Sequence, residues 1–177
     1  DRKYGFAPLG FYEDAQIESW SELAKVVHSH GAKVGAQLLD PGPESMQILS
    51  GRQPVGPSPV VGRSHFRSPP RELSVGEIEA VIDDYAEAVR RARDAGLDVI
   101  EIHAAHGYGM VGSFLSPFFN KRTDEYGGSL EGRLKFLLDI LAAIRARVGR
   151  DFPLIVRVSG DERRPGGRDV QETQFIA

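Results

Sequence analysis

Three side chains capable of acid–base chemistry stand close together near the middle of the chain. His103, His106 and Tyr108 directly follow a short apolar segment, with glycine at positions 107 and 109. Imidazole and phenol groups can hold a polar oxygen and move a proton, and an unperturbed Tyr, with a pKa of about 10, is a protonated acid at neutral pH. Glycine lets the backbone turn there with few steric limits. This spacing predicts a catalytic site where a buried strand ends.

A metal site and a purely structural cluster are the alternatives for these residues. His103 and His106 need not share a face at a strand end, and no third ligand stands at an obvious spacing, so we predict no metal ion here. A packed tyrosine beside a hydrogen-bonded histidine pair would instead serve stability alone.

Four helices are predicted from apolar residues at helical spacing and from residues typical of helix ends. Ser74 and Glu77 have the spacing of a capping box, and a last helix begins near Asp169 or Val170. For the first three, the predicted N-caps and closing glycines are Asp14 and Gly31, Ser74 and Gly96, and Ser129 and Gly149. Their predicted apolar faces are Ile17, Trp20, Ala24 and Val27; Ile78, Ile82, Tyr85, Val89 and Ala92; and Leu130, Leu134, Leu137, Leu141, Ile144 and Val148.

Three short apolar segments, residues 33–39, 97–102 and 153–159, are predicted strands that alternate with these helices. Residues 40–73 hold most of the prolines and are predicted to form turns and a short hairpin. Near-continuous apolar strands suggest a parallel sheet with helices on both faces. A doubly wound sheet and a (β/α)8 barrel both fit, although a complete barrel needs about 250 residues.

Each predicted strand places an unusual polar residue near the same rim, where the active sites of barrels lie. Gln37 and Arg157 belong to the first and third strands and flank the histidines of the second. A charged Arg157 in an apolar strand is costly unless it meets an anion or a partner. An ion pair with Glu101 on the neighbouring strand is the structural alternative.

Residues 100–133 read IEIHAAHGYGMVGSFLSPFFNKRTDEYGGSLEGR. The pieces EIHAAHGY, FLSP and NKRTDEYGGS make this run closely similar to the Old Yellow Enzyme family of FMN-dependent ene-reductases. The resemblance implies an α/β fold, a (β/α)8 TIM barrel of which residues 1–177 form a single partial domain covering about strands three to five. It also implies that NKRTDEYGG supports the site from below, with Asp124 and Arg133 as charge partners.

The resemblance further assigns roles to the rim residues. The residue matching Gln37 hydrogen-bonds the pyrimidine end of FMN, and the one matching Arg157 lies near the N1/O2 edge, where a guanidinium stabilises an anionic reduced flavin. Those matching His103 and His106 bind the substrate oxygen, and the one matching Tyr108 protonates the α-carbon after hydride leaves flavin N5.

The function implied is that of an NAD(P)H:flavin oxidoreductase that passes hydride from NADH or NADPH through FMN to an activated C=C bond of an enone-type substrate. The chain departs from many relatives at residues 40–43, where Asp-Pro-Gly-Pro replaces a His-x-Gly-Arg segment. Two alternatives remain open: a flavin and iron–sulfur enzyme of the dienoyl-CoA reductase type, favoured by GDERRPGGRD, and a noncatalytic barrel fragment.

Composition bounds the partners and the compartment. The formal net charge of −3 favours neither a nucleic-acid nor a membrane-surface partner, and leaves a small unsaturated carbonyl substrate and a homo-oligomer open. The absence of cysteine and of a signal-peptide pattern suggests a cytoplasmic protein. The chain lacks an initiator methionine and stops inside a predicted helix, so we expect both ends to be cut from a longer sequence.

Overall fold

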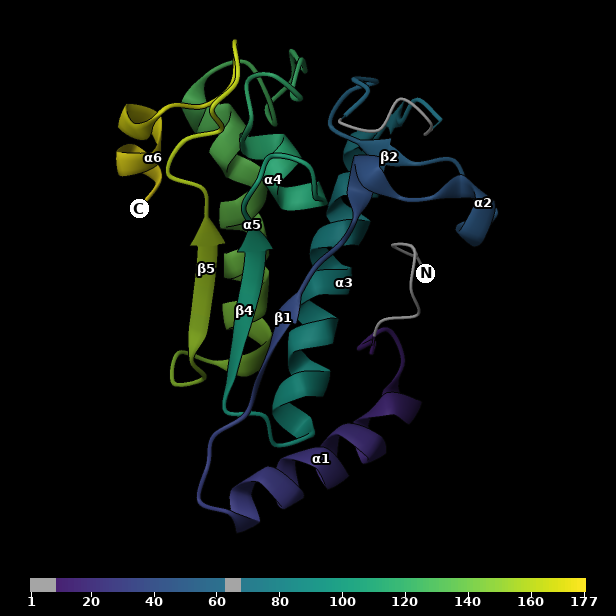
Figure 1. The fold of residues 1–177 in the computed structure, drawn as a ribbon, viewed down its shortest axis with the longest axis vertical. Coiled ribbons are helices and arrows are strands. Elements are labelled where there is room, and N and C mark those ends of the chain that lie inside the picture. Colours follow the sequence, from purple (N-terminus) through teal and green to yellow (C-terminus); the bar gives the residue numbers. More distant parts are fainter. Residues whose placement is uncertain (1–8, 63–67) are drawn as a thin grey trace.

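Three parallel strands, backed by two long helices, form the centre of the molecule (Figure 1). The computed structural model describes residues 9–62 and 68–177. The strands are β1 (Gly35–Leu38), β4 (Val99–Ala104) and β5 (Leu154–Val158), which lie side by side in chain order. Helix α3 (Val75–Asp94) connects β1 to β4, and α5 (Leu130–Val148) connects β4 to β5. These two helices pack against each other and therefore cover the same face of the sheet.

This one-sided winding decides between the two architectures that the sequence left open. A doubly wound sheet places helices on both faces, whereas sequential strands with all crossovers on one face are the repeat of a (β/α)8 barrel. Ile100 and Ile102 are fully buried against the helices, while Glu101 and Ile155 lie on the opposite, open face. The expectation of helices on both faces was therefore wrong, because apolar residues of β4 alternate with polar ones that the strand directs away from the helices.

The segment between β1 and α3 contains only short elements. Outside residues 63–67, which lie beyond the described residues, two brief helical turns and one pair of very short strands occupy it. They are η2 (Gly42–Glu44), α2 (Gln47–Ser50), β2 (Val55–Gly56) and β3 (Arg71–Glu72). Because β2 and β3 pair in parallel, the predicted hairpin is wrong, since a hairpin joins antiparallel strands.

The helix ends follow the predicted caps with one exception. Ser74 accepts a hydrogen bond from Glu77 N, Ser129 from Gly132 N and Asp169 from Glu172 N, at the starts of α3, α5 and α6 (Val170–Ile176). Asp14 is not an N-cap. It lies inside a short 3-10 helix, η1 (Asp14–Gln16), that precedes α1 (Ile17–Ser29), and its carboxylate pairs instead with the side chains of Arg90 and Arg91.

The predicted apolar face of α5 packs against the core, but its residues are buried to different extents. Leu137, Ile144 and Val148 are buried as predicted, but Leu134 and Leu141 are only partly buried. Phe136 is fully buried, with its ring centroid 4.2 Å from that of Phe114 in α4 (Met110–Leu115). Helix α5 contacts α4 as well as α3, so its buried stripe is wider than one row of leucines indicates. No helix in the described ranges is long and apolar enough to cross a bilayer.

The capping box of α3 makes stability depend on pH. Arg71 forms a two-pronged ion pair with Glu77 at 2.6 and 2.9 Å, and Ser74 donates to the same carboxylate. Arg71 is the main cause and Ser74 the next in lowering the pKa of Glu77 to about 2. Because this folded-state value lies below the unfolded one, the stabilisation is complete above about pH 4.5 and is lost as the pH falls towards 2.

We therefore expect Glu77→Gln to lower stability by about 0.5–1 kcal/mol at pH 7, since the pair is partly exposed, and by about half as much at pH 3. Denaturant unfolding of the full chain at both pH values measures this difference. Glu79→Gln, an exposed carboxylate on the same helix, is the matched control. A Glu77→Gln deficit of equal size at both pH values would contradict the prediction.

Candidate active site

The three predicted acid–base side chains form one cluster at the carboxyl end of β4. The ring centroids of His103 and His106 lie 5.4 Å apart, those of His106 and Tyr108 also 5.4 Å, and those of His103 and Tyr108 6.1 Å. His103 lies within β4 rather than after it, because the strand continues two residues beyond the predicted end. His103 is 5% exposed, His106 is exposed and Tyr108 is partly buried. The cluster therefore forms one wall, in which exposure to solvent increases from His103 through Tyr108 to His106.

A tight turn brings His106 and Tyr108 back towards His103. His106 and Gly107 both have φ of +68°, in the left-handed region that glycine adopts freely and other residues rarely adopt. The backbone N–H of His106 donates to Ser159 Oγ at 2.7 Å, just after β5. Two successive left-handed residues reverse the chain between β4 and α4, which places Tyr108 beside the histidine rings.

The environment of His103 favours its neutral form. Burial, followed by the charges of His106 and Arg157, lowers the pKa of His103 below its ordinary value of 6.5. At pH 7 the ring is then a neutral imidazole that carries one N–H donor. Its Nδ1 atom is buried without a hydrogen-bond partner in the described part of the chain. A neutral donor at this position can polarise a substrate oxygen without burying a full charge.

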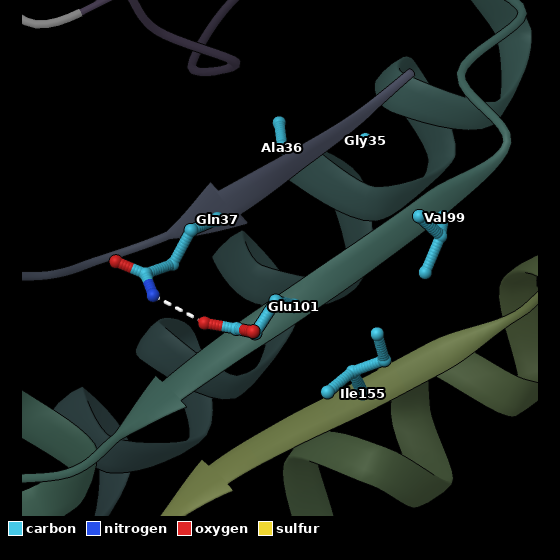
Figure 2. A pocket seen from close by; sticks show the side chains of 6 residues that line it. All are labelled: Gly35, Ala36, Gln37, Val99, Glu101 and Ile155. Carbon is cyan, nitrogen blue, oxygen red and sulfur yellow. Dashed lines mark hydrogen bonds between the residues drawn. The ribbon is translucent and has the colours of Figure 1, made fainter. Parts of the chain in front are cut away.

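Gln37 and Glu101 lie opposite each other on the open face of the sheet (Figure 2). Gln37 Nε2 donates to a carboxylate oxygen of Glu101, and the amide oxygen of Gln37 points away from that contact. Since a carboxylate only accepts hydrogen bonds, this pairing sets which end of the amide remains available. An open hollow of about 250 Å³ adjoins them, and its remaining lining residues are Gly35, Ala36, Val99 and Ile155.

Arg157 projects from β5 on the same face, one layer nearer the carboxyl ends of the strands. The strand register pairs it with His103 and pairs Glu101 with Ile155. Arg157 is exposed and, in the described ranges, takes part in no ion pair, whereas Glu101 bonds Gln37. The ion pair between Arg157 and Glu101 that the sequence left open is therefore not formed. The guanidinium remains available to an anionic or electron-rich group at the rim.

The loop that departs from the family pattern packs on the start of α4. Asp40 O accepts a hydrogen bond from Met110 N at 2.9 Å, and Asp40 Oδ1 accepts one from Gly42 N at 2.8 Å. Gly42 has φ of +49°, and a Cβ there would stand 2.8 Å from Met110 Cα. Only glycine combines this conformation with this approach, so the Asp-Pro-Gly-Pro turn fixes the spacing between β1 and the turn after β4.

The segment after α4 is held by different pairs from those expected. Arg122 binds Asp124 through two contacts of 3.0 and 2.5 Å, and Arg133 binds Glu172 of α6 at 2.8 Å. The predicted pair of Asp124 with Arg133 is wrong. Arg122 is two residues from Asp124 and reaches it within one turn of chain, while Arg133 lies on α5, where its side chain turns towards α6.

Sequence reasoning missed three residues that shape this site. Glu101 was predicted only as a partner of Arg157. It is two positions before His103 on the same strand, so the two side chains were expected to lie on the same face of the sheet. Ser159 and Glu162 were assigned no role. No local pattern marks them, since their contacts with residues 106 and 116 join segments far apart in the chain.

The known proteins that this chain resembles agree with its description as a barrel segment with a polar rim. The chain matches the NADH:flavin oxidoreductase / NADH oxidase family over residues 7–177. It is 43% identical over 166 residues to an NADH oxidase of Thermoanaerobacter brockii, covering 93% of this chain and 25% of that protein. A solved Old Yellow Enzyme homologue from Zymomonas mobilis superposes with a TM-score of 0.80 at 35% identity, over 93% of this chain and 48% of that one. A 2-naphthoyl-CoA reductase gives 0.87 at 32%, over 93% and 26%.

The sheet and its covering helices are thus part of a (β/α)8 barrel, as predicted. The chain belongs to the NADH:flavin oxidoreductase / NADH oxidase family, the family of the Old Yellow Enzymes. It spans a quarter to about half of the length of the relatives that it matches. The described residues contain no group of three or more His, Cys, Asp or Glu side chains that could hold a metal ion.

Proposed function

We propose that this chain, as one partial barrel domain over residues 1–177, supplies the substrate-facing wall of an FMN-dependent enzyme that reduces an activated C=C bond with NADH or NADPH. The observation that carries the proposal is the cluster of His103, His106 and Tyr108 at the carboxyl end of β4. Imidazole donors hold a carbonyl oxygen, and a phenol gives a proton nearby, as reduction of an enone requires.

The polar side chains on the open face, Gln37 and Arg157, fit the pyrimidine edge of a flavin. That edge alternates hydrogen-bond donors and acceptors, and the amide oxygen of Gln37, which does not bond Glu101, can accept from it. Arg157 offers a permanently charged fork with no ion-pair partner in the described ranges, suited to the edge where negative charge collects on reduction. FMN, when bound, would supply the hydride chemistry; Gln37 and Arg157 would hold and orient it.

The remaining side chains act on the substrate. His103, neutral at pH 7, and His106 donate hydrogen bonds to the carbonyl oxygen and withdraw electron density from the double bond. The β-carbon then becomes a better hydride acceptor. Tyr108 transfers its phenolic proton to the α-carbon. A substrate lacking an electron-withdrawing oxygen would lose the contacts of both histidines and is not expected to react.

Anaerobic half-reactions of the full chain loaded with FMN test this proposal. NADH or NADPH should bleach the flavin absorbance, and 2-cyclohexen-1-one should restore it, with cyclohexanone as a saturated control. Absorbance near the flavin bands, monitored by stopped flow, follows both steps. A protein that takes up no FMN, or that is reduced yet never reoxidised by any activated alkene, would refute the proposed function.

A second candidate is reduction of the unsaturated acyl group of a CoA thioester by a larger flavin and iron–sulfur enzyme. The likeness to a 2-naphthoyl-CoA reductase, at a TM-score of 0.87, supports it, as does the GDERRPGGRD segment. Iron and labile sulfide in the purified full chain, with faster reoxidation by an unsaturated acyl-CoA than by the free enone, would favour this candidate. Failure to bind flavin at all would favour the noncatalytic fragment.

A further inference from the structure

The turn that carries the proposed substrate-facing residues has an unfavourable backbone conformation. His106 is a β-carbon-bearing residue with φ of +68°, and Gly107 follows it with the same value. Such a residue keeps this conformation only where its surroundings hold it, and positions of this kind gather at functional sites. The contacts that hold His106 therefore bear on the direction of its ring.

Ser159 makes the contact that holds His106. Its Oγ accepts the backbone N–H of His106 at 2.7 Å, and it stands directly after β5, 53 positions further along the chain. The hydrogen bond joins the carboxyl ends of two neighbouring strands at the rim. His106 in turn stacks on Tyr108, with 16° between the ring planes, so a shift of the His106 backbone displaces both rings.

Glu162 closes the same turn from below. A Cβ at position 107 would stand 3.3–3.5 Å from the Glu162 carboxylate, whose side chain is only 2% exposed. Glu162 Oε2 accepts a hydrogen bond from Ser116 Oγ at 2.7 Å, which anchors the carboxylate at the end of α4. The carboxylate thus forms the floor of the turn, in close contact with position 107, where the φ of +68° already favours glycine.

Thr173, which is bound by a buried arginine, contacts Ser159 itself. Arg168, whose side chain is fully buried, donates from Nη1 to Thr173 Oγ1 at 2.8 Å. The Thr173 hydroxyl lies 3.1 Å from the carbonyl oxygen of Ser159 and 3.0 Å from that of Asp169, to which it can donate. Ser159 is therefore held on its carbonyl side by the start of α6 while its hydroxyl holds His106.

We propose that Ser159 is a positioning residue that aims His106 and Tyr108 at the substrate, with Glu162 as the floor of the same turn. The inference rests on the proposed function for its effect on turnover, but its effect on the backbone at residue 106 is independent of any activity. Ser159 touches the backbone of His106 rather than its ring, so it acts through His106.

Ser159→Ala in the full chain tests the proposal by two readouts. Amide hydrogen exchange at His106, measured by NMR, should become about 3- to 10-fold faster, as expected for one lost hydrogen bond. In the FMN-loaded protein, kcat/KM for 2-cyclohexen-1-one should fall about 10- to 100-fold through misplaced side chains, while the affinity for FMN is kept. Ser159→Thr retains the hydroxyl and should restore both.

Ser21→Ala is the matched control, because its hydroxyl donates to Ala95 O and it belongs to α1, the helix at the end of the molecule where the strands begin (Figure 1). It should leave both readouts unchanged. Unchanged His106 exchange in Ser159→Ala would overturn the proposal, as would faster exchange with undiminished turnover in a protein whose wild type reduces the enone. If the wild type reduces no alkene, the proposed function fails. Faster exchange in Ser159→Ala would still show that Ser159 holds the backbone of His106.

Discussion

Tyr108→Phe is expected to slow reduction of 2-cyclohexen-1-one by about 10²- to 10⁴-fold, the usual contribution of a positioned general acid. The substitution removes one oxygen and keeps the ring that stacks on His106 at 5.4 Å. The histidines would still hold the carbonyl oxygen, but the α-carbon would have to take its proton from water. Reduction of the flavin by NADH or NADPH needs no proton from Tyr108 and should keep its rate.

Separate stopped-flow measurement of the two half-reactions provides the test. Tyr126→Phe is the matched control: Tyr126 is buried, does not belong to the cluster of His103, His106 and Tyr108, and its hydroxyl donates to Asp139 at 3.0 Å. It should cost about 1 kcal/mol of stability through that lost bond and leave enone reduction intact. Equal slowing of both half-reactions by Tyr108→Phe would show that the residue serves binding or folding rather than proton transfer.

Arg122→Ala is expected to lower the free energy of unfolding by about 2–4 kcal/mol, because each buried acceptor left without its donor costs about 1–3 kcal/mol. The Arg122 side chain is 3% exposed. It binds both carboxylate oxygens of Asp124 and also donates to Pro57 O and Leu73 O at 3.2 and 2.6 Å. Its loss leaves two buried carbonyl oxygens without this donor. It also removes the partner of the Asp124 carboxylate, which is 36% exposed and whose pKa is lowered chiefly by Arg122.

Chemical denaturation of the full chain, followed by circular dichroism, measures this loss. Arg122→Lys keeps the charge but lacks the planar fork, so it should recover only part of the stability. Arg150→Ala removes an exposed guanidinium and should change stability by less than about 0.5 kcal/mol. If Arg122→Ala were no worse than Arg150→Ala, the contacts of Arg122 would not stabilise the fold as we expect.

Local signals were sufficient for most helix ends. Ser74, Ser129 and Asp169 cap α3, α5 and α6, and Gly31 and Gly96 follow α1 and α3 with φ of +76° and +86°. These predictions depend on hydrogen bonds within four residues and on the freedom of glycine, and therefore little on distant parts of the chain. Asp14 failed as a cap because Arg90 and Arg91, more than seventy positions away, draw its carboxylate towards α3.

Pairings between distant segments were less predictable. The sequence offered Glu101 to Arg157 and Asp124 to Arg133, whereas Glu101 bonds Gln37 and Asp124 bonds Arg122. Opposite charges near one another in a sequence pattern do not establish which partner lies within reach. The register of β1 against β4 and the course of the loop before α5 decide that, and both result from packing.

The sequence alone determined the family, the alternation of strands and helices, and the gathering of His103, His106 and Tyr108 within six positions. Those features depend on local propensity and on a continuous motif. Only the tertiary structure decided that the helices cover one face, that Gln37 pairs with Glu101 while Arg157 stays unpaired in the described ranges, and that Ser159 holds His106 in a left-handed conformation. The physical reason is that strand register and helix packing bring together residues more than fifty positions apart, which no local pattern encodes.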